Sequence, residues 1–301
     1  MQLDEIITGA SHLAQAYCIT AGDTFRLKAI DPDDTAGLEA EDKPRARESL
    51  QAGVQALAAL QDMLYAQDHW AVLLIFQGMD AAGKDSAIKH VMSGVNPQGC
   101  QVVSFKSPSA EELDHDYLWR CSRHLPARGH IGIFNRSYYE EVLIVRVHEA
   151  LLQAQHLPPA LLTANLWKDR LHDIRRFERY LHRNGVLIRK FFLHVSPQEQ
   201  KQRFLERIDN PTKHWKFSAA DVRERQYWPN YMAAYEAMIR STATETAPWY
   251  VVPADHKWFT RVVVAAAVIE ALASLNLHYP QLAEAKRQEL TVARQALLEE
   301  P

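Results

Sequence analysis

Cysteine is scarce in this chain, with three among 301 residues, at positions 18, 100 and 121. An odd number of widely spaced cysteines offers neither a disulfide framework nor the paired ligands of a structural zinc site. The first residues, "MQLDEIITGA", also lack the basic segment and apolar run of a signal peptide. We therefore expect free thiols and a cytoplasmic protein.

Long apolar runs and an excess of one charge are missing as well. No apolar stretch reaches the roughly 18 residues that a membrane span needs, so we expect no membrane association. The 34 basic and 37 acidic residues give a net charge of -3. That balance argues against a general nucleic-acid coat protein, although it is compatible with a local basic channel. Hydrophobic residues make up 47%, enough for a sizeable core.

Short apolar runs alternate with helical patterns along the chain. Apolar residues at helical spacing predict a helix over 48–67, and five strands are predicted at 70–76, 100–105, 131–135, 186–195 and 248–254. Strands that alternate with helices favour an α/β fold, a three-layer α/β/α sandwich with a five-stranded parallel sheet. We divide the chain into an N-terminal extension (1–47), a core (48–275) with a charged helical lid at about 197–246, and a C-terminal helix (276–301).

The stretch "LLIFQGMDAAGKDSAIKHV", residues 73–91, carries the strongest functional signal. A buried strand precedes the glycines and a helix follows them, which is the setting of a phosphate-binding loop. Backbone N–H groups at the helix start would face phosphate, and Lys84 would reach the phosphate that moves. Asp85 stands where the usual motif has a hydroxyl, and Asp80 adds a second carboxylate. The predicted phosphate ligands in this loop are Gly78, Ala81, Ala82, Gly83, Lys84, Asp85 and Ser86.

A second signal lies in "GIFNRSYYEE", residues 132–141. Asn135 ends a predicted strand and Arg136 follows, at the carboxyl edge where open sheets bind their ligands. Glu140 and Glu141 come next. A surface salt bridge for Arg136 and solvated charges for the glutamates are the alternatives.

The predicted lid supplies the third signal, a cluster of six basic side chains interleaved with Trp215, Tyr227 and Trp228. The six are Arg203, Arg207, Lys213, Lys216, Arg223 and Arg225. An ordinary exposed helix pair, partly balanced by acidic neighbours, is one interpretation. A basic lid above a phosphate loop also suits a polyanionic substrate, because arginine clamps phosphate with paired donors and lysine acts as a point charge.

Five segments together resemble the polyphosphate kinase 2 family over roughly residues 25–275. They are "QGMDAAGKD", "GVNPQGCQVVSFKSPSAEELDHDYLWR", "GHIGIFNRSYYEEVLIVRVH", "RIDNPTKHWKFSAADVRER" and "APWYVVPADHKWFTRV". The resemblance implies a P-loop kinase core with a helical lid. It also implies phosphoryl transfer between inorganic polyphosphate and nucleotides, with magnesium, or manganese in its place.

The resemblance also implies roles for individual residues. Asp80 would be the functional acid of the loop, and Lys84 and Arg136 would contact the transferring phosphate. The polyphosphate chain would be guided by Arg207, Lys213 and Lys216. The implied metal ligands are Asp80, Asp85 and Glu140, and two divalent ions between two phosphate chains would account for the extra carboxylates. The implied nucleotide ligands are Asn135, Arg136, Tyr139 and Glu140.

Two departures from the common family pattern narrow the subgroup. Asn135 replaces an aspartate before Arg136, and Glu140 replaces an asparagine, as in the class III branch that phosphorylates both AMP and ADP. The predicted protein is thus a polyphosphate:AMP/ADP phosphotransferase with Asp80, Lys84, Arg136 and Glu140 as catalytic residues. We expect a homo-oligomer without nucleic-acid partners.

Two other functions are compatible with the same sequence. One is an ATP-dependent nucleoside monophosphate kinase on the same fold, which an exchange of donors would distinguish. The other is a nucleic-acid or polyanion binding module with an idle loop, which would bind without turnover.

Overall fold

The computed structural model describes residues 3–300 and contains a six-stranded sheet of order β1-β6-β5-β2-β4-β3. Its strands are β1 (Cys18–Ile19), β2 (Ala71–Gln77), β3 (Cys100–Ser104), β4 (Ile131–Asn135), β5 (Val186–His194) and β6 (Trp249–Pro253). Strands β2 to β6 pair in parallel, and every residue of β2, β5 and β6 is buried. Parallel strands covered on both faces read as continuous apolar runs, so the predicted α/β fold is confirmed.

The prediction of five strands is wrong by one, because β1 pairs antiparallel with β6 at the edge of the sheet. This strand lies inside the range predicted as an N-terminal extension. It has two residues, and such a short segment carries no periodicity by which a sequence could reveal it. Its neighbour Tyr17 accepts a hydrogen bond at its backbone oxygen from Val251 N, 2.9 Å away, which ties the extension to the sheet.

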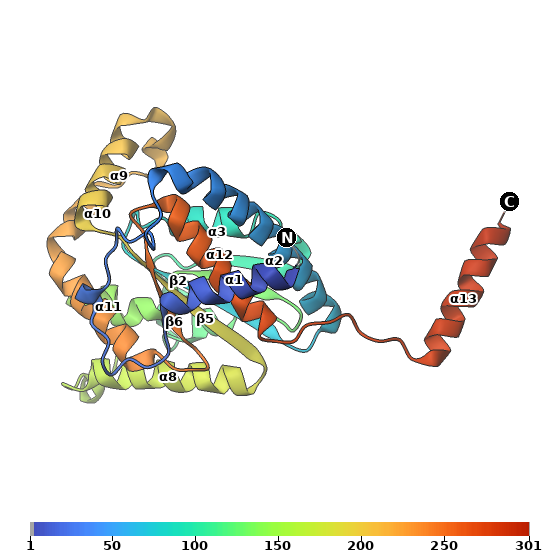
Figure 1. The fold of residues 1–301 in the computed structure, drawn as a ribbon. Coiled ribbons are helices and arrows are strands. Elements are labelled where there is room, and N and C mark those ends of the chain that lie inside the picture. The colour runs from blue at the N-terminus through green and yellow to red at the C-terminus, as the bar shows by residue number, and fades with distance from the viewer. Residues whose placement is uncertain (1–2, 301) are drawn as a thin grey trace.

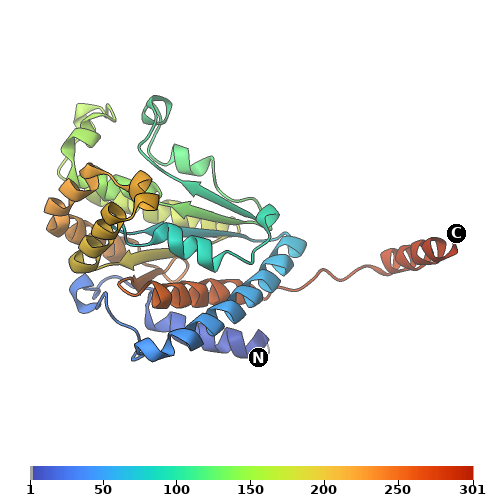
Figure 2. The same cartoon turned by 90° about the horizontal axis from the view of Figure 1, so that it is seen from above.

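Two helical layers enclose the sheet (Figures 1 and 2). One contains α1 (Leu3–Ala16), α2 (Lys43–Gln67), α3 (Lys84–Val91) and α12 (Lys257–Ala273). The other contains α8 (Leu166–Arg183) and α11 (Trp228–Thr242). Helix α12 packs on both α1 and α2, and its alanine-rich sequence "VVVAAAVIEALA" is buried almost throughout. Small side chains permit this close three-helix packing.

The segment after β5 forms a projection at the carboxyl edge of the sheet, at the upper left of Figure 1. It contains α9 (Pro197–Asp209), a 3-10 helix (Pro211–Lys216), α10 (Ala219–Glu224) and a short 3-10 turn (Arg225–Tyr227). Ser196 caps α9 by accepting a hydrogen bond from Glu199 N, and Pro197 occupies the first turn. Helix α11 lies in the range predicted for the lid, but it buries one face against α8.

Shorter helices connect the main elements. They are α4 (Ala110–Leu113), α5 (Trp119–Ser122), α6 (Ile144–Val147) and α7 (Glu149–Gln153). At the C-terminus, α13 (Glu284–Glu299) is exposed along its whole length and lies apart from the body (Figure 1). The three cysteines are free thiols. Among residues 3–300, no helix has the length and apolar character that crossing a membrane requires.

Candidate active site

The order of the strands brings the two sequence signals together. Strand β2 lies between β5 and β4, so the carboxyl ends of β2 and β4 are neighbours. The phosphate loop, residues 78–83, follows β2, and Arg136 follows β4. Arg136 N extends the pairing by donating to Phe76 O over 3.0 Å. The predicted loop and the predicted strand-end arginine therefore share one edge of the sheet, where open α/β sheets bind ligands.

The loop has a backbone that requires its glycines. Gly78 has a φ of 154°, and a Cβ there would lie 2.9 Å from Leu193 O of the adjacent strand β5. Gly83 has a φ of 106° and stands at the N-cap of α3. Ala81 also has a positive φ, 62°, which is costly for a residue with a side chain. This strained turn directs the start of α3 into the cleft, where its free N–H groups favour an anion.

Lys84 is buried at the first position of α3. Its Nζ donates to Gly78 O at 2.7 Å and to Met79 O at 3.2 Å. Within residues 3–300 no carboxylate lies at ion-pair distance from this ammonium. Burial, with the charge of Arg136 as the next cause, lowers the pKa of Lys84 to about 8. A buried cation bound only to carbonyls is ready to accept an anionic partner.

Arg136 points back at the loop. Its φ of 64° is an unusual conformation for a non-glycine residue, and such strain is common at functional sites. Its Nη2 donates to Asp80 Oδ1 over 2.6 Å. Burial opposes the charge of the guanidinium, but Glu140 and Asp80 outweigh that effect and raise the pKa of Arg136. The guanidinium therefore keeps its positive charge beside the loop at any working pH.

Each predicted metal ligand is held by one neighbouring donor. Asp80 accepts from Arg136, as described. Asn135 Nδ2 donates to Asp85 Oδ1 at 2.6 Å, and Gln77 Nε2 donates to Glu140 Oε1 at 2.9 Å. Within the described residues, no group of three or more metal-ligating side chains is close enough to hold an ion by itself. The carboxylates are hard oxygen donors. Mg²⁺ commonly binds only one or two protein carboxylates and completes its coordination with water and substrate phosphates, so this small set of ligands is compatible with Mg²⁺.

Tyr139 was predicted from the sequence as a nucleotide ligand, but the structure places its side chain in the core. Its side chain is fully buried, and its hydroxyl donates to Glu178 Oε1 over 2.7 Å. Its ring meets Trp249 edge-on at 4.9 Å between centroids. In the 3-10 helix Tyr138–Val142, this side chain faces the core while Glu140, the next residue, faces the loop. The sequence alone did not reveal which residues of this irregular turn point inward.

A cleft of about 670 Å³ opens above the loop. Its walls include the loop residues Asp80, Ala81, Gly83, Lys84, Asp85 and Ser86, together with Asn135 and Arg136. Three lid cations face them, namely Arg207, Lys213 and Lys216. Residues of the predicted basic lid and of the predicted phosphate loop therefore line the same cleft. Trp215 lies between the two lysines and is 78% exposed, with Lys216 Nζ 4.8 Å from its ring centre.

Several residues of this cleft were not among the predicted site residues, and they include the charged side chains of Lys106, Asp221 and Lys257. Lys106 follows strand β3 at the same edge of the sheet, so the strand-end argument that found Arg136 would also have found it. Asp221 comes from α10, and burial together with the charge of Asp80 raises the pKa of its carboxyl group. Lys257 begins α12, after the last strand. Only the fold brings these two to the cleft.

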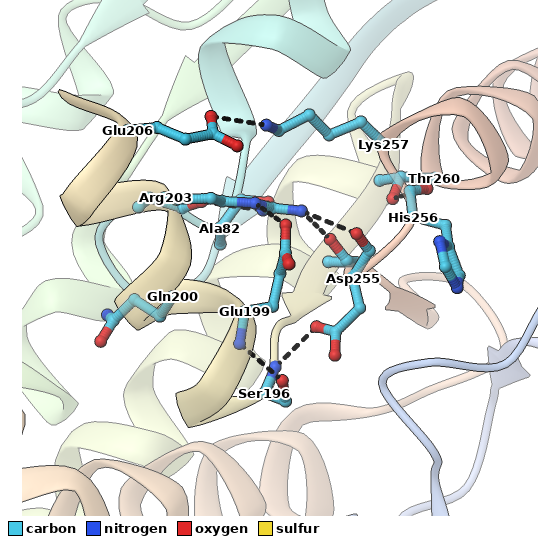
Figure 3. A network of polar contacts seen from close by, with 12 residues as sticks. Ala82, Ser196, Glu199, Gln200, Arg203, Glu206, Asp255, His256, Lys257 and Thr260 are labelled. Atoms are coloured by element: carbon cyan, nitrogen blue, oxygen red, sulfur yellow. Dashed lines mark hydrogen bonds and ion pairs between the residues drawn. The ribbon is translucent and has the colours of Figure 1, made fainter. Parts of the chain in front are cut away.

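Arg203 differs from the other lid cations, because it is buried and fully engaged (Figure 3). Its Nη1 donates to Ala81 O at 2.8 Å and Ala82 O at 3.0 Å. Its Nη2 donates to Ala254 O and Asp255 O, and its Nε pairs with a glutamate one helical turn earlier. Arg203 therefore fastens the root of the lid to the phosphate loop, and its part is to position the loop.

Arg225 is also used within the lid. Its Nη1 donates to Pro197 O and to Gln200 Oε1, and Gln200 Nε2 in turn donates to Asp80 O at 2.9 Å. Two of the six predicted lid cations thus hold the lid against the loop, and three face the cleft. Ser86, one of the predicted phosphate ligands, accepts a hydrogen bond from Arg261 Nη2 at 2.9 Å.

A glycine loop before a helix, a buried lysine, an arginine opposite it and a basic lid define a phosphotransferase of the P-loop kinase type. Residues 40–280 match the family described as Polyphosphate kinase 2, and the chain belongs to this family.

Individual relatives agree with this assignment. The chain is 55% identical to an ADP-polyphosphate phosphotransferase of Rhodopseudomonas palustris over 86% of this chain and 90% of the relative. It is 45% identical to an AMP/ADP-polyphosphate phosphotransferase of Meiothermus ruber over 88% and 95%. A crystal structure of polyphosphate kinase 2 from Arthrobacter aurescens matches with a TM-score of 0.83 and 39% identity, over 93% of this chain and 96% of that one.

Proposed function

We propose that this protein transfers a phosphoryl group from inorganic polyphosphate to AMP and to ADP, which gives ADP and ATP. The observation that carries the proposal is the cleft itself, with a phosphate loop on one wall and the cations Arg207, Lys213 and Lys216 on the other. A donor that is anionic along its whole length needs positive charge on both walls. Relatives named for ADP and for AMP and ADP support these acceptors.

In the proposed reaction, an ionised phosphate oxygen of the nucleotide attacks the terminal phosphorus of polyphosphate. The bond to the bridging oxygen breaks, and its electron pair leaves with the shortened chain. The attacking oxygen carries no proton that must be removed, so no general base is required. Lys84 and Arg136 would stabilise the charge on the moving group, and Arg203 keeps the loop in position.

A divalent cation, which we infer to be Mg²⁺, with Mn²⁺ as a substitute, would neutralise charge between the two phosphate chains. Asp80, Asp85 and Glu140 are the residues that would hold it. Each carboxylate has only one donor beside it in the contacts described above, which leaves oxygen lone pairs for a cation and its water. All three surround Lys84, whose charge they offset.

Acceptor choice is assigned to the pair Asn135 and Glu140. Asn135 neutralises the strand end and holds Asp85, whereas Glu140 places a negative charge near Arg136. Compared with the common family pattern, the negative charge lies at position 140 and not at position 135. A cation bound near Glu140 could then lie beside the single phosphate of AMP. We also infer a cytoplasmic homo-oligomer that has no nucleic-acid partner.

A coupled assay with AMP, ADP, GMP and GDP, each with polyphosphate, tests the proposal. Turnover of AMP and of ADP is expected. The same assay with ATP in place of polyphosphate distinguishes the nucleoside monophosphate kinase. Only that enzyme would phosphorylate AMP faster with ATP than with polyphosphate as the donor. Binding of polyphosphate without any turnover would favour the polyanion-binding module. Light scattering of the purified protein measures the oligomeric state.

A further inference from the structure

A second basic surface lies at the opposite edge of the sheet from the phosphate loop. It is formed by the second half of α8, which ends where β5 begins, and by the end of α11, which precedes β6. Two clefts of about 610 and 530 Å³ adjoin there and share Arg179 and Arg183. The arginines that line them are Arg175, Arg176, Arg179, Arg183 and Arg240. In Figure 1, α8 runs along the lower edge, away from α9 and α10.

Arg240 is tied to the fold, because its Nη2 donates to Asp23 O at 3.2 Å. The other four arginines of this surface lie on α8. The four α8 arginines are exposed, and among residues 3–300 none of them lies within ion-pair distance of a carboxylate. Two carboxylates, Asp23 and Glu245, line the clefts against the five arginines. Glu178 of the same helix faces inward and binds Lys190. In a chain of net charge -3, such a concentration of cations is unexpected for a purely structural surface.

The arginines form a row, and a row suits a chain of charges. Arg176, Arg179 and Arg183 stand three and four residues apart, which places them on one face of α8. They extend over roughly 10 Å of helix. Guanidinium groups bind phosphate with paired donors, so successive arginines match successive phosphates.

We propose that this surface, Arg176, Arg179 and Arg183 above all, binds the distal part of a long inorganic polyphosphate chain whose end occupies the catalytic cleft. The inference rests on the proposed use of polyphosphate as donor. Strand β5 has nine residues and separates the two sites by roughly 30 Å, so a short chain cannot reach both. A long chain held at two sites dissociates less readily, because each site raises the effective concentration at the other.

The test compares long-chain polyphosphate with a hexaphosphate fraction as donors, at saturating ADP. In the triple variant Arg176→Gln, Arg179→Gln, Arg183→Gln, the KM for the long chain should rise about fivefold, and its dependence on salt should become shallower. The KM for hexaphosphate should stay unchanged. These side chains are exposed, so the melting temperature should also be unchanged.

Two control variants distinguish this surface from general electrostatics. Replacing Arg45, Arg287 and Arg294 with glutamine removes the same charge from exposed positions elsewhere, and neither KM should change. Replacing Lys213 and Lys216 with glutamine changes the lid, and both KM values should rise. An unchanged KM for the long chain in the α8 variant, or an equal rise for both donors, would overturn the proposal.

Two further results decide the remaining cases. A change of oligomeric state in the α8 variant, measured by light scattering, would identify the surface as a contact between subunits and overturn the proposal. If the wild type turned over neither donor, the proposed function would fail by itself. Titration calorimetry with long-chain polyphosphate would then still test whether the α8 surface binds polyphosphate. Equal affinity of the wild type and the α8 variant would contradict the proposed binding.

Discussion

Two buried lysines, one in the core and one in the phosphate loop, differ in their partners. Lys190, in the core on β5, is fully buried and binds Glu178 Oε2 at 2.5 Å, with Tyr139 and a backbone oxygen completing its partners. Lys84, in the phosphate loop, binds two carbonyl oxygens and has no carboxylate at ion-pair distance among residues 3–300. Burial is the main reason that the pKa of each lysine is lowered.

The difference shows how a buried charge indicates its role. A buried ion pair with all donors satisfied is part of the structure, and removing one partner leaves the other uncompensated. A buried cation near a second cation, with only carbonyls as partners, is favourable once an anion arrives. The core pair is therefore expected to govern stability, and we propose that the loop lysine governs binding and turnover.

The largest effect is expected in the core. Lys190→Met leaves Glu178 buried without its cation, which should lower the free energy of unfolding by about 3–5 kcal/mol. The double variant Lys190→Met, Glu178→Gln removes both charges and should recover a large part of that loss. Urea unfolding of the wild type, both single variants and the double variant measures the coupling. Additive losses would show that the two charges act independently.

Next in size is the loss of turnover when a site cation is removed. Lys84→Ala and Arg136→Ala should each lower kcat by roughly 100- to 1,000-fold, since a preorganised charge beside the moving phosphate is worth about 3–4 kcal/mol. The melting temperature should change little, in contrast to Lys190→Met. A variant with near-normal turnover and an unchanged melting temperature would contradict the role given to that residue.

The pH dependence sharpens the comparison further. The free enzyme should lose donor affinity as Lys84 deprotonates, so kcat/KM for polyphosphate should fall above an apparent pKa of about 8. One unit above that pKa, the loss should be about tenfold. In Lys84→Arg the side chain stays charged, and this alkaline limb should disappear whatever rate remains. Persistence of the limb in that variant would assign it to another group.

The smallest effect concerns acceptor choice. Glu140→Asn should weaken phosphorylation of AMP about five- to tenfold more than that of ADP, which corresponds to roughly 1 kcal/mol of discrimination. The control is Glu141→Gln, since Glu141 belongs to a separate network with Arg170. Ratios of kcat/KM for AMP and ADP give the answer. Equal losses for the two acceptors in Glu140→Asn would make Glu140 general to the chemistry.

Much of the fold was predictable because its central strands β2, β5 and β6 are buried on both faces. Strand β4 was predicted at 131–135, as observed, and the other parallel strands differ by a residue or two at their ends. Continuous apolar runs between turn residues give such strands their signal. The edge strand β1 escaped because pairing with β6, and not its own two residues, defines it.

The sequence by itself determined the phosphate loop, its lysine and the strand-end arginine. Glycines at positions that need a positive φ, placed between a buried strand and a helix, are a local requirement that any reader of the chain can see. It also determined that a basic segment follows the fourth parallel strand. These features depend on neighbouring residues in the sequence, so they can be predicted without knowledge of the fold.

Only the tertiary structure decided which charges are free to act. It buried Tyr139 and Arg203, placed Asp221 and Lys257 in the cleft, and left the α8 arginines exposed at the far edge. The partners that decide the matter lie far away in sequence, as Arg203 is 122 residues from Ala81. Burial and contact partners decide whether a charged side chain binds ligand, stabilises the fold or stays in solvent. Segments that are distant in the sequence determine both the burial and the partners.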